Sequence, residues 1–171
     1  KVASEYNNAF VLIEINVSDQ VAQILHQELE YENILMVTRN AGSQIIGGGF
    51  GGAKSYLGVS TDKKVKRVGC HNFKALVEEN KLLVTDPDTI SEISTFIEKR
   101  GSYEADEGYH DDLVMPLVLF GWLSTQAYFK ELNNINMRKI MYEKQMKAIE
   151  EDLTPFGFYD DGNPEADPLN F

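Results

Sequence analysis

Apolar positions predict a strand, a helix and a second strand in the first 40 residues. Residues 9–16 are apolar on both faces except at Glu14, a pattern typical of a central strand buried on both sides, as in a parallel sheet. Ser18 is a candidate helix N-cap, and apolar residues at helical spacing after it predict an amphipathic helix over residues 19–30. Residues 34–38 are typical of a short strand. Together these elements predict a βαβ unit with a right-handed crossover.

Glycine interrupts this regularity between residues 39 and 60. The run from Gly47 to Gly52 removes both helix and strand signals, which predicts either a long mobile loop or a glycine-bent hairpin. A phosphate-binding loop would need a glycine directly before its lysine and a strand leading straight into it. Ala53 stands before Lys54 here, so nucleotide binding is the least favoured interpretation of this segment.

Helical spacing returns at Asp62 and dominates the rest of the chain. Residues 113–128 are apolar nearly all round, which predicts a buried helix in which Pro116 is tolerable only in the first turn. Prolines, glycines and acids predict a loosely ordered acidic tail over residues 153–171, after a single domain over residues 1–152. The other predicted elements are a helix over 62–80, a strand over 81–85, a helix from Asp88 or Thr89 to Gly101, and a more polar helix over 131–152.

Charge is unevenly distributed along the chain. Lys and Arg number 16 against 27 Asp and Glu, a net charge of −11, but residues 150–171 hold seven acids and no base. The remaining residues therefore carry 16 bases and 20 acids, a net charge of −4. This distribution excludes a uniformly basic nucleic-acid-binding surface and is compatible with a local basic groove.

Cysteine content and hydropathy narrow the class of protein further. The single cysteine, Cys70, cannot form an internal disulfide, which fits a reducing compartment, and we expect it to be a packing residue. No apolar run approaches the roughly 18 residues of a membrane span, so no membrane partner is expected. The first residues have neither an initiator Met nor the features of a signal peptide, so we expect a piece of a longer chain.

Glu14 is the most informative single residue. A carboxylate within an apolar strand costs several kcal/mol to desolvate unless an Arg, a Lys, a proton or a metal ion relieves it. The alternative is a strand end that emerges into solvent and leaves Glu14 exposed. Both interpretations stay open at this point.

A second candidate site is the segment Gly-Tyr-His-Asp-Asp112, directly before the most apolar helix. One aspartate is expected to cap that helix, and the other is then free to point elsewhere. If Asp111 or Asp112 faces Glu14, the carboxylates form a hard oxygen site suited to Mg²⁺ or Mn²⁺. His110 is then a positioning group or an ordinary loop histidine, because imidazole is a poorer ligand for Mg²⁺.

The densest basic cluster comprises Lys63, Lys64, Lys66 and Arg67. Such a run is usually a solvated helix face. The functional alternative is contact with nucleic-acid phosphates, which gains weight if an acidic metal site needs a polyanion held nearby.

The order of these motifs resembles a known family. The segments that carry the resemblance are, in chain order, Ile-Glu-Ile-Asn16, Lys-Arg-Val-Gly-Cys-His-Asn-Phe-Lys74, Lys-Leu-Leu-Val84, Gly-Tyr-His-Asp-Asp-Leu-Val114 and Phe-Gly-Trp-Leu-Ser-Thr-Gln126. From about Tyr6 to Tyr128 the chain resembles the C-terminal nuclease domain of the terminase large subunit of tailed bacteriophages, of the myovirus type. The Gly-Tyr-His-Asp-Asp-Leu-Val segment together with Phe-Gly-Trp-Leu is the specific part of the match.

The resemblance implies a ribonuclease H-like mixed sheet flanked by helices and a divalent-metal endonuclease that cuts concatemeric viral DNA. The family uses three acids; the second corresponds to Glu14, and the third to the aspartate pair, with Asp112 favoured over Asp111. The first acid and the ATPase motor of the family have no counterpart in this sequence, so the chain by itself is expected to hold an incomplete site. The implied chemistry is phosphodiester hydrolysis by two Mg²⁺ or Mn²⁺ ions about 3.5–4 Å apart.

The same resemblance implies partners and a location. The partners are double-stranded viral DNA and, in the parent protein, the portal protein and the small terminase subunit. The location is the host-cell cytoplasm, at the procapsid portal during packaging.

Two rival interpretations remain. One keeps the fold and assigns a resolvase-like or transposase-like nuclease. The other is a DNA- or protein-docking module whose acids are structural, in which Glu14 would pair with a Lys or Arg and no metal would bind.

Overall fold

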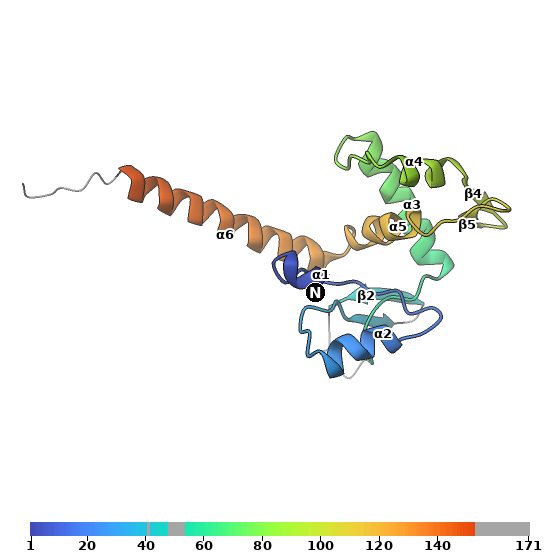
Figure 1. Cartoon of the computed structure of the whole chain (residues 1–171), viewed down its shortest axis with the longest axis horizontal. Coiled ribbons are helices and arrows are strands. Elements are labelled where there is room, and N and C mark those ends of the chain that lie inside the picture. Colours follow the sequence, from blue (N-terminus) through green and yellow to red (C-terminus); the bar gives the residue numbers. More distant parts are fainter. Residues whose placement is uncertain (41, 48–53, 153–171) are drawn as a thin grey trace, which may run out of the picture. The chain divides into compact units, whose positions relative to one another are not determined.

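The computed structural model describes residues 1–40, 42–47 and 54–152 (Figure 1). Residues 1–132 form one compact unit and residues 133–171 belong to a second. The protein is mixed α/β with small antiparallel sheets, so the α/β class predicted from sequence is confirmed at this level. The described elements are α1 (Val2–Glu5), α2 (Gln20–Gln23), the π-helix η1 (Ile24–Glu28), β1 (Val37–Asn40), β2 (Ser43–Ile46), β3 (Ser55–Tyr56), α3 (Lys63–Glu78), α4 (Pro87–Ser94), β4 (Phe96–Lys99), β5 (Ser102–Ala105), α5 (Val114–Leu123) and α6 (Ala127–Asp152).

The segment predicted as a buried central strand, residues 9–16, pairs at only two points. Val11 bridges Ile34 and Glu14 bridges Val59, both in parallel. The parallel relation of the first two predicted strands is therefore confirmed at one bridge. Burial on both faces is wrong, since Val11 is half-buried and Glu14 is exposed. The reason is that no long strand among the described residues pairs with this segment, so no continuous sheet encloses it.

The predicted helix over residues 19–30 forms as two short pieces. Helix α2 continues directly into the π-helix η1. The N-cap of α2 is Asp19 and not the predicted Ser18, although the Ser18 hydroxyl oxygen accepts a hydrogen bond from the Gln20 backbone N–H at 3.1 Å. Ala22 is fully buried, whereas Val21 and Leu29 of the predicted apolar stripe are exposed.

A three-stranded antiparallel sheet in the order β2-β1-β3 follows. Its β1–β2 hairpin pairs Val37 with Ile46 and turns through Gly42, whose φ of +80° suits glycine. The hairpin alternative is therefore correct for the start of the 39–60 segment, while residues 48–52 of the glycine-rich run lie outside the described residues. Val37 and Ile46 pack in the main core, whose other buried members are Leu35, Val59, Val65, Leu119, Trp122 and Leu123.

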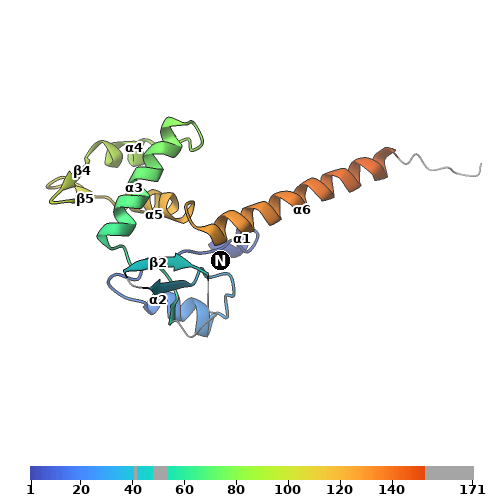
Figure 2. The ribbon, with the colours of Figure 1, turned by 180° about the vertical axis from the view of Figure 1, so that it is seen from behind.

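Helices α3 and α5 pack closely against each other, and both views show them crossing (Figure 1, Figure 2). The predicted start of α3 is confirmed, because the Asp62 carboxylate accepts from the Val65 N–H at 2.8 Å. Two glycines make the crossing possible: a Cβ at Gly121 would lie 2.5 Å from the carbonyl oxygen of Gly69 and 2.9 Å from the backbone nitrogen of Phe73. This contact holds the C-terminal half of α5 against the middle of α3.

Two of the elements predicted after α3 differ from the structure: the strand over 81–85 is absent among the described residues, and the helix from Asp88 or Thr89 forms but ends early. Residues 81–85 are irregular rather than a strand, since the N–H groups of Lys81 and Leu82 both bond to the Leu76 carbonyl at the end of α3. The helix predicted to reach Gly101 ends at Ser94, and β4 and β5 form a hairpin instead. Arg100 and Gly101 take up the positive φ angles of its two-residue turn, which the helical spacing of the apolar residues had hidden.

The buried helix predicted over residues 113–128 ends early. Helix α5 stops at Leu123 because the hydroxyls of Ser124 and Thr125 bond to carbonyls of its last turn, and α6 begins at Ala127. Pro116 is the third residue of α5, within the first turn, where it is tolerated. No helix in the described part of the chain is long and apolar enough to cross a membrane.

Candidate functional site

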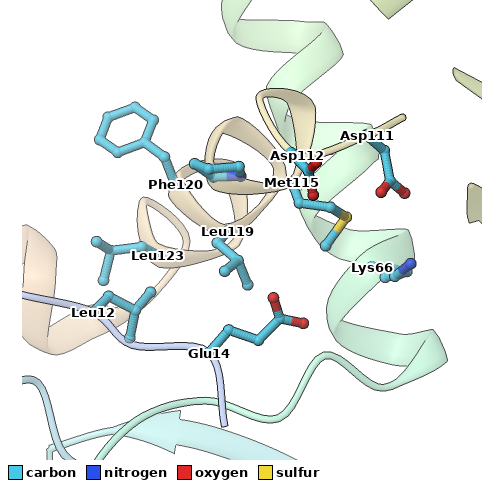
Figure 3. A pocket seen from close by; sticks show the side chains of 10 residues that line it. Leu12, Glu14, Lys66, Asp111, Asp112, Met115, Leu119, Phe120 and Leu123 are labelled. Carbon is cyan, nitrogen blue, oxygen red and sulfur yellow. The ribbon is translucent and has the colours of Figure 1, made fainter. Parts of the chain in front are cut away.

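A cavity of about 530 Å³ brings together three carboxylates that the sequence singled out (Figure 3). Glu14 reaches into it from the extended segment, and Asp111 and Asp112 line it at the start of α5. Lys66 lines the same cavity from α3. Its apolar wall comes mainly from α5 and comprises Leu12, Met115, Pro116, Leu119, Phe120 and Leu123. Glu14 therefore shares one cavity with two aspartates that follow it by at least 97 residues in sequence.

The Glu14 carboxylate is held by one of its two oxygens. Its Oε1 accepts a hydrogen bond from Asn16 Nδ2 at 2.7 Å and another from the hydroxyl of Thr61. Glu14 makes no ion pair with a Lys or Arg among the described residues, which is the pairing that the docking-module interpretation predicted. The exposed interpretation of Glu14 is the correct one, and the Oε2 oxygen is left for the cavity.

A network of polar side chains supports this arrangement, and sequence reasoning missed it. Asn16 Oδ1 accepts from the Thr61 N–H at 2.6 Å and from the Ser60 hydroxyl at 3.1 Å. Gln44, buried on β2, donates to the Ser60 carbonyl at 2.6 Å and to the Asp62 carboxylate at 3.0 Å. The one local signal was Asn16, a polar residue directly after an apolar segment. The contribution of Thr61 depends on a contact 47 residues away in sequence.

Helix α5 is capped by Glu92, a residue of α4. Glu92 Oε2 accepts from the backbone N–H of Leu113 at 2.7 Å and of Val114 at 3.3 Å. The expectation that Asp111 or Asp112 would cap this helix is therefore wrong. In the described part of the chain neither aspartate side chain has a hydrogen bond or an ion pair, so both carboxylates are available to the cavity.

The four-residue basic cluster does not act as one group. Lys66 is half-buried at the cavity, where its ammonium donates to the Tyr103 carbonyl at 3.2 Å. Lys64 reaches back to the carbonyl of Gly42 at 3.4 Å, and Lys63 is exposed at the first position of α3. Arg67 lines a different cavity.

His110 is exposed and does not line the cavity of the three acids. A role for His110 next to a bound metal therefore receives no support from this arrangement. Cys70 is half-buried, and burial raises the pKa of its thiol to about 11, an effect that the charge of Lys66 opposes. The thiol is protonated at neutral pH, in agreement with the predicted packing role.

The carboxylates of the cavity are the type of ligand that a hard divalent cation prefers, but they do not form a cluster of three ligands. Carboxylate oxygens are the ligands that Mg²⁺ and Mn²⁺ prefer. Yet no group of three or more His, Cys, Asp or Glu close enough to hold one ion together occurs among the residues that the structure describes. Mg²⁺ keeps several waters and takes one or two protein carboxylates plus substrate phosphates, so a site for it does not require three clustered acids.

No protein-family model matches this chain. The chemistry of the cavity is therefore the basis for any functional assignment. Three carboxylates with unused oxygens and one ammonium can together attract a cation and an anion, which is the requirement for metal-assisted reactions of phosphate esters.

Proposed function

We propose that this chain is part of a divalent-metal-dependent endonuclease with a ribonuclease H-like fold, of the type found in viral DNA-packaging terminases. The observation that carries the proposal is the use of Glu92, rather than Asp111 or Asp112, to cap α5. An aspartate that caps a helix has an ordinary structural explanation, whereas two aspartates that do not cap the helix and line the same cavity as Glu14 do not. The parallel bridges of residues 9–16 agree with the strand order that such a fold needs but do not identify it.

In this proposal Glu14 and Asp112 would hold Mg²⁺ or Mn²⁺, and Asp111 would assist them. A bound ion would supply an activated water and stabilise the leaving oxygen of the cleaved phosphodiester. Asn16 and Thr61 orient the Glu14 carboxylate, and α5 supplies most of the apolar wall of the cavity. Lys66 is placed to contact a phosphate of the substrate, since two of its three N–H groups have no partner among the described residues.

The substrate in this proposal is double-stranded viral DNA. The portal protein and the small terminase subunit would be partners of the parent protein, at the procapsid portal in the host cytoplasm. These assignments depend on the resemblance of the Gly-Tyr-His-Asp-Asp-Leu-Val114 and Phe-Gly-Trp-Leu123 segments to that family.

The first acid of the family has no counterpart in this sequence, so cleavage of DNA by the chain alone is not expected. Metal binding is therefore the direct test of the proposed site. Isothermal titration with MnCl₂ should show a site in the wild-type chain that is weakened at least tenfold in Glu14→Gln and in Asp112→Asn. The matched control is Glu98→Gln, which neutralises an exposed acid on β4 away from the cavity and should leave the titration unchanged. Absence of Mn²⁺ binding in the wild-type chain, or equal binding in all variants, would contradict the proposed site.

A further inference from the structure

A second cavity lies along α3 and has the opposite charge character. It measures about 590 Å³ and is lined by Arg67, His71 and Lys74 of α3 and by Tyr103 of β5. Among the described residues no Asp or Glu lines it, in contrast to the three acids of the first cavity. Lys66 and Arg67 are neighbours in sequence but line different cavities, so α3 presents one face to each.

The polar groups of the second cavity have few partners within the described part of the chain. The Arg67 guanidinium, the His71 ring and the Tyr103 hydroxyl have no hydrogen bond or ion pair there. The Tyr103 ring is held in place by stacking on Phe96, with the ring centroids 6.3 Å apart. Lys74 pairs only with Glu78, at 3.6 Å on an exposed surface, and such pairs exchange readily for another anion.

The remaining lining does not oppose an anion. Cys70 also lines the cavity, and because burial raises its pKa to about 11 it stays a neutral thiol at pH 7. The basic residues continue beyond the cavity: Lys63 precedes Arg67 by four positions, so it lies on the same face of the helix. From Lys63 to Lys74 this basic face is about 16 Å long at 1.5 Å per residue.

We propose that the outer face of α3, formed by Lys63, Arg67, His71 and Lys74, binds the phosphate backbone of duplex DNA at a second point, outside the acidic cavity. The length of this face exceeds the phosphates of a single nucleotide, while duplex DNA presents one charge per roughly 1.7 Å along its axis. The identity of the ligand rests on the proposed function, which makes duplex DNA the substrate.

The surface can be tested without the metal site. Fluorescence anisotropy of a short labelled duplex, in EDTA and between 50 and 200 mM salt, should show weaker binding for Arg67→Gln and for Lys74→Gln than for the wild-type chain. Each substitution should reduce the slope of log K against log salt by about 0.9, the value for one lost phosphate contact. The matched control, Lys144→Gln in α6, removes the same charge elsewhere and should change the slope far less than either substitution on α3. Circular dichroism and melting temperature should show that all variants fold alike.

Three outcomes would overturn the proposal. The first is an unchanged slope in both Arg67→Gln and Lys74→Gln, and the second is an equal effect of Lys144→Gln. The third is displacement of the duplex by millimolar inorganic phosphate at constant ionic strength, which would identify a site for a free phosphate instead. Failure of the proposed nuclease site is recognised separately: the wild-type chain would then bind no Mn²⁺, while the dependence of duplex binding on Arg67 in EDTA would remain.

Discussion

The orientation of one carboxylate determines what the acidic cavity can do. Both hydrogen bonds to Glu14 end on Oε1, one from Asn16 and one from the Thr61 hydroxyl. Hydrogen bonds that fix a ligand side chain in place reduce the entropy lost when a metal binds. Glu14 is exposed, so without these donors its side chain would sample many rotamers. The two donors therefore supply the preorganisation that burial does not.

Removal of the Thr61 hydroxyl should weaken metal binding more than it weakens the fold. Thr61→Val keeps the shape of a buried side chain and removes one donor to Glu14, so we expect Mn²⁺ affinity to fall about tenfold, the usual effect of losing such a partner. Thr61→Ser retains a hydroxyl and should restore affinity. Thr89→Val removes a comparable hydroxyl contact, to Asp86 at 2.7 Å, and should leave the Mn²⁺ titration unchanged. Equal titrations for Thr61→Val and the wild type would show that Thr61 has no part in the site.

The Cys70 thiol gives the chain a defined dependence on alkaline pH. Burial raises its pKa from 9.0 in the unfolded reference to about 11, so the folded state holds its proton more tightly. The resulting stabilisation is fully present below pH 9 and is lost as the pH rises from 9 to 11. Urea unfolding should therefore show a loss of stability over this range in the wild-type chain that is absent from Cys70→Ala. At pH 7 the thiol should react with iodoacetamide far more slowly than a free cysteine, and rapid labelling of the folded chain would contradict the raised pKa.

At the scale of elements, the cap of α5 couples α4 to the acidic cavity. Glu92 satisfies the first N–H groups of α5 from another helix, a task that usually falls to a residue just before the helix. The local sequence offers Asp111 and Asp112 for this task, and the structure uses neither. The position of α4 thus determines whether two carboxylates are available beside Glu14.

Glu92→Ala should reverse this arrangement. With its cap removed, α5 should lose about 1 kcal/mol of stability, and an aspartate should turn toward the free N–H groups. Chemical denaturation should show the loss of stability, and the Mn²⁺ titration should show weaker binding because one carboxylate is diverted. Glu92→Gln keeps an accepting oxygen and should have a smaller effect on both measurements. A Glu92→Ala variant that loses stability but binds Mn²⁺ as the wild type does would separate the cap from the site.

How much of this could be predicted from sequence depends on the distance over which each contact acts. The start of α3 was predictable because Asp62 bonds to Val65, three residues away. The β4–β5 hairpin was not, since Ile93, Phe96 and Ile97 also fit a helical stripe and only Arg100-Gly101 signals the turn. Glu14 was found because it interrupts an apolar segment, and Asp111 and Asp112 because they are adjacent acids directly before the most apolar helix. Their supports were missed because Thr61 and Glu92 act across 47 and 21 residues of sequence, which no local pattern records.

At the scale of the whole molecule, the net charge of the chain does not reveal how charge is distributed around α3. The net charge is −11, yet α3 borders an acidic cavity and a second cavity whose described lining residues include no Asp or Glu. A polyanion that approaches the chain is repelled by its net charge and attracted only within roughly a Debye length, about 10 Å at 0.1 M salt, of the basic face. We therefore expect the net negative charge of the chain to lower the affinity for duplex DNA, independently of the contacts that the basic face makes with phosphates.

Neutralisation of acids distant from α3 in sequence should relieve this repulsion. Amide substitution of Asp160, Asp161, Glu165 and Asp167 changes the net charge from −11 to −7, so we expect tighter duplex binding at low salt. The gain should shrink as salt increases and vanish near 1 M, where the Debye length is about 3 Å. The matched control neutralises four exposed acids in the first 132 residues, Glu5, Glu28, Glu98 and Glu107, and should produce a gain of similar size. Anisotropy titrations over a salt series measure both variants. A gain that persists at high salt would instead mean that the carboxylates themselves contact the proposed DNA-binding face of α3, because only short-range contacts escape screening.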